Sequence, residues 1–345
     1  MRNRTLTFYV PGLISPAKSV SGLDTALALD GLVLLLSRAR RTSNIVSSYD
    51  GGLFDLFDFS GLNNTFPVAP VARLIDGNDV DGSYWLRADP VHLQPNRDQI
   101  VMLGNAQLNV QRDEAAQLQS EFNALFAEDG LHLETPVNHR WYLKCATPPQ
   151  ICTTSLEEVL WKNIDPFLPK GSDALYWHKL LNEAQMLFFN SDVNQRRRQE
   201  GKPEINSIWM WGGGCLPDAK SVSQPSRWRT VWGNDVVSRG LAVLYEQESA
   251  ALPECIEDWL ENSDDDGDHL MAFDGAQLAL SQRDIAAWKV FMGGLEDAWI
   301  SPAIKALKEG HICRVSIVTD GDSYALTAKD LRRWWKKRRP LSRHG

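Results

Sequence analysis

Apolar residues recur along the chain with two spacings, and the spacing changes from segment to segment. Residues 205–214, INSIWMWGGG, alternate at period two, so Trp209 and Trp211 share one face of a strand while Ile208 and Met210 share the other. Both faces are apolar, which is typical of parallel strands covered by helices on both sides. We therefore predict a buried strand of an α/β sheet that ends at the glycines, at the edge where open α/β sheets bind ligands.

Further short apolar runs alternate with helix-like segments toward both ends of the chain. TLTFYVPGL at 5–13 and ICRVSIVTDG at 312–321 predict strands, while 23–40 and 284–310 predict helices. Strands that alternate with helices favour a mainly parallel sheet flanked by helices. The predicted fold class is α/β.

Residues 80–147 interrupt this alternation with a different order of elements. Two strand-like runs precede a helix at 113–130, and two more strands follow it. The order strand-strand-helix-strand-strand indicates a smaller α+β unit inserted into the larger domain. We expect a discontinuous α/β core of residues 1–79 and 148–345 around an α+β subdomain at 80–147.

Composition places the chain among folded, acidic proteins. It is 43% hydrophobic and 23% charged with a formal net charge of −8, which argues against nucleic acid or an anionic membrane as partner of the whole surface. Five cysteines without a CxxC pair favour reduced thiols. MRNRTLTFYVPGLI is interrupted by Pro11 and resembles a first strand more than a signal peptide, and no apolar run is long enough to span a membrane. We expect a cytoplasmic protein.

Several stretches resemble the RpfE-type regulatory proteins of bacteria, and this resemblance covers most of the chain. They are WLRADPVHL at 85–93, NEAQMLFF at 182–189, VNQRRRQEGKPEINSIWMWGGG at 193–214 and RGLAVL at 239–244. That group is distantly similar to cofactor-independent phosphoglycerate mutases of the archaeal type, most firmly over residues 170–245. The resemblance implies an alkaline-phosphatase-like α/β fold with a small inserted unit.

The resemblance also implies a catalytic apparatus that this sequence does not match. Enzymes of that superfamily hold two divalent metals, commonly Mn²⁺ or Zn²⁺, which activate a serine or threonine nucleophile. The family's first metal-binding aspartate follows the first strand, but here that strand leads into Pro11. The family's histidine-containing run is also missing, since the last strand offers only Asp320 and Asp322. We predict no metal and no cofactor, with Mn or Zn bound only if distant residues assemble a site.

The candidate ligand-binding residues lie in the stretches that carry the resemblance. They are Arg87, Asp89, His92, Asn194, Arg197, Asn206, Gly212, Gly213 and Gly214. Arginine matches the geometry of phosphate or carboxylate, and glycine N–H groups can cradle an anion. A structural alternative stays open, in which Arg87 and Asp89 form an ion pair on one strand face and the arginines at 196–198 complement a helix dipole. No catalytic residue is assigned.

The segment 329–343 concentrates positive charge in an otherwise acidic chain. Its cationic residues are Arg332, Arg333, Lys336, Lys337, Arg338, Arg339 and Arg343, and they flank Trp334 and Trp335. Such a tail could bind nucleic acid or a membrane surface. We favour a terminal amphipathic helix that packs both tryptophans onto the protein, so nucleic acid is an expected partner only through this tail.

Together these observations predict a catalytically degenerate, phosphoglycerate-mutase-like regulatory protein that binds a small phosphorylated anion or a protein partner. The alternative is an active metal-dependent mutase that converts 3-phosphoglycerate to 2-phosphoglycerate by phosphoryl transfer. Whether the chain is an enzyme depends on whether a metal site assembles.

Overall fold

The computed structural model describes residues 4–16, 27–43, 48–59, 66–77, 81–96, 99–103, 108–217, 226–263, 266–319 and 321–344. The chain divides into two compact units: unit 1 contains residues 1–60 and 222–345, and unit 2 contains residues 61–221. Unit 2 is therefore a continuous insertion into a discontinuous unit 1. The inserted unit is wider than the range 80–147 expected from the sequence.

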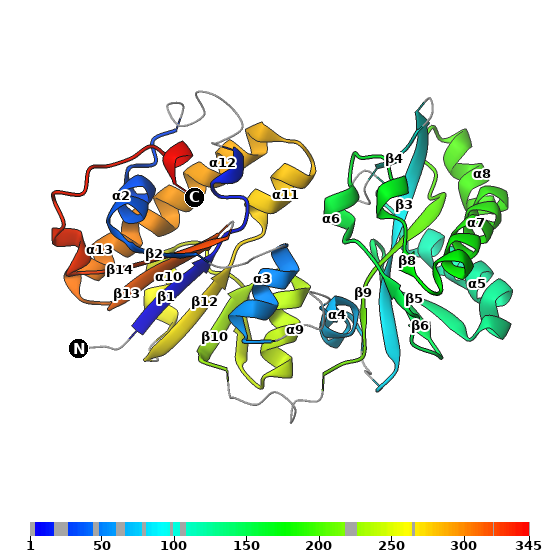
Figure 1. The fold of residues 1–345 in the computed structure, drawn as a ribbon, viewed down its shortest axis with the longest axis horizontal. Coiled ribbons are helices and arrows are strands. Elements are labelled where there is room, and N and C mark those ends of the chain that lie inside the picture. The colour runs from blue at the N-terminus through cyan, green and yellow to red at the C-terminus, as the bar shows by residue number, and fades with distance from the viewer. Residues whose placement is uncertain are drawn as a thin grey trace. The chain divides into compact units, whose positions relative to one another are not determined.

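Unit 1 is built on a seven-stranded sheet of order β11-β10-β12-β1-β13-β14-β2 (Figure 1). The first five strands are parallel to one another, β14 is antiparallel to β13, and β2 is antiparallel to β14. The strands are β1 (Arg4–Tyr9), β2 (Arg40–Ser43), β10 (Trp228–Gly233), β11 (Glu248–Ala250), β12 (Gly267–Ala272), β13 (Arg314–Thr319) and β14 (Asp322–Thr327). This mainly parallel sheet confirms the predicted α/β class.

Helices flank this sheet and supply its core. They are α2 (Asp30–Arg38), α3 (Tyr49–Leu56), α9 (Val236–Leu244), α10 (Ile256–Asn262), α11 (Gly275–Ser281), α12 (Ile285–Leu295) and α13 (Ser301–Glu309), with a π-helical turn at Glu296–Ile300. Leu6 and Phe8 of β1 belong to the same buried cluster as Leu35 of α2, Trp288 of α12 and Ile304 of α13. No helix of the described residues is both long and apolar enough to cross a membrane.

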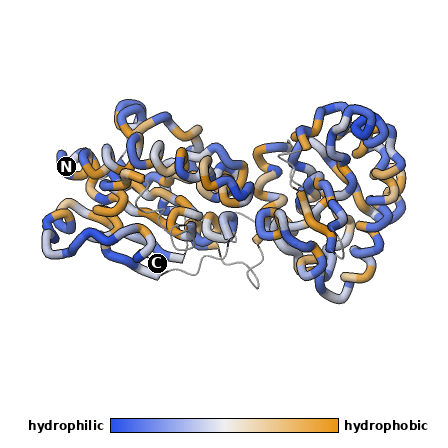
Figure 2. Tube along the Cα trace, turned by 90° about the horizontal axis from the view of Figure 1, so that it is seen from above, coloured by the Kyte–Doolittle hydropathy of each residue, from blue (hydrophilic) through white to orange (hydrophobic). Residues whose placement is uncertain are grey.

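Unit 2 is built on an antiparallel sheet of five strands. Its elements are α4 (Val68–Asp76), β3 (Tyr84–Asn96), β4 (Gln99–Leu103), α5 (Arg112–Phe126), β5 (Leu131–Val137), β6 (Arg140–Cys145), α6 (Leu156–Val159), α7 (Ala174–Asn190), α8 (Asp192–Gln199) and β9 (Ser207–Gly214), with a small β7–β8 pair at Ile151–Cys152 and Lys170–Gly171. The order β3-β4-α5-β5-β6 confirms the predicted strand-strand-helix-strand-strand unit. Figure 2 shows hydrophobic segments grouped inside each unit.

The prediction that residues 205–214 form a parallel strand of the α/β sheet is wrong. β9 lies antiparallel to β3 in unit 2, with Trp209 opposite Asp89 and Trp211 opposite Arg87. The strand is buried on both faces, as its pattern requires, because Ile208 and Met210 join the core beneath α5 and α7 while α4 packs against the other face at Gly212. This pairing is also why unit 2 extends well beyond residue 147.

The prediction of a terminal amphipathic helix is also wrong. The described residues beyond β14, 328–344, contain two short 3₁₀ helices, Asp330–Arg332 and Leu341–Arg343, and no α-helix. Trp334 and Trp335 are 81% and 63% exposed, and the residue that anchors this segment in the core is Leu341, at 2% exposure. Leu331 also packs against this core, and backbone and side-chain hydrogen bonds add to these apolar contacts.

Candidate functional site

Three parallel strands of unit 1 end side by side. Tyr9 at the end of β1 is paired with Ala272 at the end of β12, and Ala272 is paired with Gly233 at the end of β10. The carboxylates that follow, Asp235 after β10 and Asp274 after β12, therefore lie at one carboxyl edge of the sheet. This edge is where open α/β sheets bind ligands.

Asp235 caps the helix that follows its strand. Oδ1 accepts hydrogen bonds from the N–H groups of Val237 at 3.0 Å and Ser238 at 2.8 Å at the start of α9. Oδ2 accepts from the hydroxyl of Ser238 at 2.5 Å and from the hydroxyl of Tyr49 at 3.1 Å. Four donors occupy the roughly four acceptor positions that a carboxylate offers.

Tyr49 connects α3 to this edge. Its hydroxyl donates to Asp235, and its backbone carbonyl accepts from the hydroxyl of Tyr9 at 2.5 Å, with the two rings 5.4 Å apart between centroids. Burial, and then the negative charges of Asp235 and Asp274, raise the pKa of Tyr49 well above its ordinary value. Tyr49 is therefore a neutral hydrogen-bond donor throughout the physiological pH range.

Asp274 completes the group. Asp274 is exposed at the surface, and partial loss of hydration, and then the charge of Asp235, raise the pKa of its carboxyl. In the described part of the chain no other residue donates a hydrogen bond to its side chain, although it stands at the N-terminus of α11. Two carboxylates that repel each other at a ligand-binding edge favour a cation or a proton between them. Asp274 is therefore the member of this group that is free to meet a ligand.

The metal pair implied by the resemblance needs more ligands than these side chains offer. Both oxygens of Asp235 are engaged, β1 continues into Pro11, and Asp320 lies outside the described residues. Asp322 accepts two hydrogen bonds from Arg41, at 2.8 and 2.9 Å. Among the residues that the structure describes, no three His, Cys, Asp or Glu side chains are grouped closely enough to hold a metal ion. The described side chains thus do not fit a two-metal centre.

Arg87 and Asp89 form a buried ion pair in unit 2, as the structural alternative predicts. Nη2 of Arg87 lies 2.6 Å from Oδ1 of Asp89, and Oδ2 of Asp89 accepts from the indole N–H of Trp211 at 2.7 Å. The guanidinium lies 5.3 Å from the ring centroids of both Tyr142 and Trp211. These two residues are 5% and 0% exposed, so a ligand would reach them only after the packing around β3 opened.

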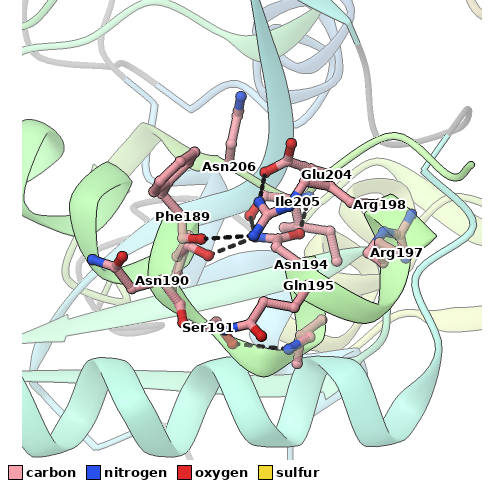
Figure 3. A network of polar contacts seen from close by, with 12 residues as sticks. Phe189, Asn190, Ser191, Asn194, Gln195, Arg197, Arg198, Glu204, Ile205 and Asn206 are labelled. Carbon is pink, nitrogen blue, oxygen red and sulfur yellow. Dashed lines mark hydrogen bonds and ion pairs between the residues drawn. The ribbon is translucent and has the colours of Figure 1, made fainter. Parts of the chain in front are cut away.

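Four other predicted residues gather around the segment that leads into β9. Nδ1 of His92 lies 2.8 Å from the carbonyl oxygen of Glu204, and Asn206 exchanges hydrogen bonds with the backbone of Leu93 at 2.7 and 2.9 Å. Asn194 bonds both the N–H and the carbonyl of Ile205, each at 2.8 Å (Figure 3). The fourth member, Arg197, donates to the Pro203 carbonyl at 2.7 Å. Their polar atoms thus fix the start of β9.

The three glycines lie at the opposite end of β9, away from these four residues. A Cβ on Gly212 would come within 2.8 Å of the Val68 side chain, and one on Gly214 within 2.6 Å of Pro67. A Cβ on Gly213 would come within 2.5 Å of the Tyr84 hydroxyl. The close approach that the glycines permit is therefore made by α4 and by β3. Anion binding by any of the nine predicted residues stays a prediction.

Sequence reasoning missed Asp235, Asp274 and Tyr49. The signal for the first two is a carboxylate one or two residues after an apolar strand, in TVWGND and HLMAFD, because the ends of parallel strands meet at one edge. Tyr49 carries no comparable signal, since its place depends on how α3 packs.

No family model matches the chain. A probable 2,3-bisphosphoglycerate-independent phosphoglycerate mutase of Geobacter sulfurreducens is 28% identical over 146 residues, which are 40% of this chain and 35% of that protein. A 2,3-bisphosphoglycerate-independent phosphoglycerate mutase of Methanosarcina mazei is 34% identical over 71 residues, which are 21% of this chain and 16% of that enzyme. The matched segments thus span about a third or less of the curated relatives.

The similarity in structure covers more of the chain. The cofactor-independent phosphoglycerate mutase from Thermoplasma acidophilum superimposes with a TM-score of 0.51 at 15% identity, over 99% of this chain and 94% of that one. A protein from Pyrococcus horikoshii superimposes with a TM-score of 0.52 at 14% identity, over 94% and 86% of the two chains. This chain therefore has the fold of the cofactor-independent phosphoglycerate mutases and a distant sequence similarity to them.

Proposed function

We propose that this chain is an RpfE-type regulatory protein on a phosphoglycerate-mutase-like scaffold, which binds a small phosphorylated ligand without transferring its phosphoryl group. The observation that carries the proposal is the state of Asp235, whose two oxygens accept four hydrogen bonds from Val237, Ser238 and Tyr49. A metal at this carboxylate would have to displace donors that cap α9, and a helix cap alone contributes about 1 kcal/mol.

The first strand supports the same proposal. Phosphoryl transfer by two metals requires ligands that lower the pKa of the nucleophile and stabilise the attacking and leaving oxygens. β1 ends at Tyr9 and continues through Val10 to Pro11. Neither a phenol held by the Tyr49 carbonyl nor a proline supplies the carboxylate that the resemblance leads one to expect.

An active metal-dependent phosphoglycerate mutase that uses Mn or Zn is the second candidate. It is favoured by the sequence similarity to such mutases over 146 residues and by the electrostatic coupling between Asp235 and Asp274 at the carboxyl edge of the sheet. A divalent cation between these carboxylates would relieve their repulsion. In this candidate Asp274 is a metal ligand.

Metal content and ligand binding, measured on the same protein, separate the two candidates. After incubation with Mn²⁺ and Zn²⁺ and extensive dialysis, inductively coupled plasma mass spectrometry should find no stoichiometric metal, and 3-phosphoglycerate should not be converted. In EDTA, 3-phosphoglycerate should still raise the melting temperature, because a ligand that binds only the folded state stabilises it. Two ions per chain, with conversion abolished in Asp274→Asn, would establish the mutase. An unchanged melting temperature would remove phosphoglycerate as the ligand.

A further inference from the structure

A strongly basic cavity of about 730 Å³ lies at the β2 edge of the unit 1 sheet. One wall is the end of α2 with the start of β2, and the other is the segment 333–344, the red trace that runs beside α2 in Figure 1. Eight lysine and arginine residues line it, and no Asp or Glu is among the described residues that do so. Its volume is that of a site for a small molecule, which typically measures about 300–1,000 Å³.

The wall formed by the terminal segment is held in place by specific bonds. The N–H of Arg339 donates to the Ser37 hydroxyl at 3.0 Å, and Nζ of Lys336 donates to the Ala39 carbonyl at 3.3 Å. His344 packs edge-on against Tyr324, with ring centroids 6.2 Å apart. Together with the buried Leu341, these contacts form the cavity from residues that are distant in sequence.

Part of the positive charge is already balanced. Arg41 bonds Asp322 through two nitrogens, and this bonding raises the pKa of Arg41. Arg333 lies 2.7 Å from Asp330, and Arg40 lies 3.6 Å from the same carboxylate. Arg338 pairs with Asp30 at 2.8 Å. Three carboxylates, those of Asp322, Asp330 and Asp30, therefore balance part of the charge of the eight cationic side chains that line the cavity.

The remaining charge is carried by side chains without an acidic partner. Within the described parts of the chain, no hydrogen bond or ion pair involves the side-chain nitrogens of Lys337, Arg339 or Arg343, all of which line the cavity. A chain with a net charge of −8 thus keeps about five uncompensated positive charges around one opening. Arginine and lysine in this arrangement bind phosphate groups through charge-assisted hydrogen bonds.

An aromatic ring stands beside these charges. Trp335 lines the cavity and is 63% exposed, while its neighbour Trp334 does not line it. Exposed tryptophan faces stack with the planar rings of nucleobases. The cavity therefore combines a site for several phosphates with a platform for a base.

We propose that this cavity binds a nucleotide that carries two or more phosphates, with its phosphates at Lys337, Arg339 and Arg343 and its base on Trp335. This site goes beyond the proposed function, because it uses none of the nine residues predicted to bind the small phosphorylated ligand. Nucleotide binding at this cavity is a second binding event, independent of the small phosphorylated ligand of the proposed function.

Calorimetric titration of the full chain with ATP in EDTA tests the proposal. The double variant Lys337→Glu/Arg339→Glu should weaken binding at least about tenfold, since it replaces two charge-assisted hydrogen bonds to phosphate with two repelling carboxylates. The matched control Lys329→Glu/Arg332→Glu removes the same charge from exposed positions of the same segment that do not line the cavity, and should weaken binding less than about twofold. Equal losses in both double variants, or no saturable binding of ATP, would overturn the proposal.

Three further titrations test the nature of the ligand. Trp335→Leu should weaken ATP binding and leave inorganic pyrophosphate unaffected. If pyrophosphate binds as tightly as ATP and Trp335→Leu has no effect, the base contact is refuted. If a single-stranded oligonucleotide binds more than about tenfold tighter than ATP, with a steeper dependence on salt, the surface serves nucleic acid and the nucleotide proposal fails.

Discussion

Arg197 and Glu114, which are 83 positions apart in the sequence, form a buried ion pair in unit 2, with Nη1 2.6 Å from Oε2. Arg197 also donates to the carbonyls of Pro203 and Leu108. One guanidinium thus joins α8 to α5 and to the segment that leads into β9. The sequence suggested that Arg197 binds an anion. In the structure the anion beside it is the carboxylate of Glu114.

Replacing Arg197 with methionine should destabilise unit 2 strongly. The Glu114 carboxylate would stay in place with almost no access to water, and removing one partner of a buried pair costs about 3–5 kcal/mol. The control is Arg196→Met, because the Arg196 side chain is exposed and, among the described residues, bonds Gln117 alone, at 3.0 Å; its effect should stay within about 0.5 kcal/mol. Urea unfolding followed by circular dichroism measures both. Similar losses for the two variants would contradict this role of Arg197.

Gly212→Ala should destabilise the protein more than Gly201→Ala. Both glycines have left-handed backbone angles, with φ of +62° and +69°. A Cβ at Gly201 meets no atom within 4 Å, whereas at Gly212 it comes within 2.8 Å of the Val68 Cβ. Gly201→Ala should cost about 1–2 kcal/mol for backbone strain alone, and Gly212→Ala about 1–3 kcal/mol more for overpacking. Thermal unfolding of the pair checks the order, and a smaller effect at Gly212 would show that α4 does not pack there.

Asp274→Asn should make the protein more stable at pH 7. The pKa of Asp274 is raised in the folded state by lost hydration and by the charge of Asp235. The folded state therefore binds the proton more tightly than the unfolded state, and stability falls as the pH rises above the pKa of the unfolded chain. The gain in the variant should be absent near pH 3, where the carboxyl is protonated in both states.

Denaturant unfolding from pH 3 to pH 8 measures this dependence. Asp297→Asn removes the same charge from an exposed position of unit 1 and serves as the control. A loss of stability in Asp274→Asn at pH 7 would mean that the Asp274 carboxylate has a stabilising partner in the folded protein.

Thiol reagents should distinguish Cys145 from the exposed cysteines. Cys145 lies in β6 at 2% exposure, and burial raises the pKa of its thiol to about 12. Cys152, Cys215 and Cys313 are exposed. Since the thiolate is the reactive species, a colorimetric reagent at pH 8 should label these three in the native protein and Cys145 only after unfolding. Cys145→Ala should leave the native signal unchanged, whereas Cys152→Ala should lower it; the reverse result would place Cys145 at the surface.

Local elements could be predicted from the sequence because their signals are local. Leu118, Phe122 and Phe126 recur at helical spacing and form the buried side of α5. The same reasoning predicted a strand within residues 312–321, where the structure has β13. Each of these predictions needs only the residues of the element itself.

Strand partners could not be predicted in the same way. The apolar residues on both faces of β9 indicate that the strand is covered on two sides. They do not indicate which strand pairs with it, because any strand covered on two sides has this pattern. The partner is β3, more than a hundred positions earlier, and its antiparallel register is set by contacts that no local window contains. The carboxyl edge was misplaced for the same reason.

The candidate site could not be predicted either, because its position depends on which strands pair. Asp235 and Asp274 stand 39 positions apart in the sequence, and only the pairing of β10 with β12 brings the ends of their strands together. The two adjacent tryptophans of the basic segment also misled the prediction, because apolar residues in a charged tail suggest anchors. In the structure Leu341 is the anchor, and Trp335 borders a basic cavity.

β1 pairs with β12 on one side and with β13 on the other, so Arg4 meets Gly267 and Thr5 meets Arg314. During synthesis β1 therefore leaves the ribosome long before β12 or β13 has been made. Until then both edges of β1 lack their partners and can pair with other chains. Residues 61–221 contain every strand of their own sheets and can close a core while synthesis continues. We therefore expect unit 2 to fold before unit 1 during synthesis, and β1 to stay unpaired until β12 and β13 are made.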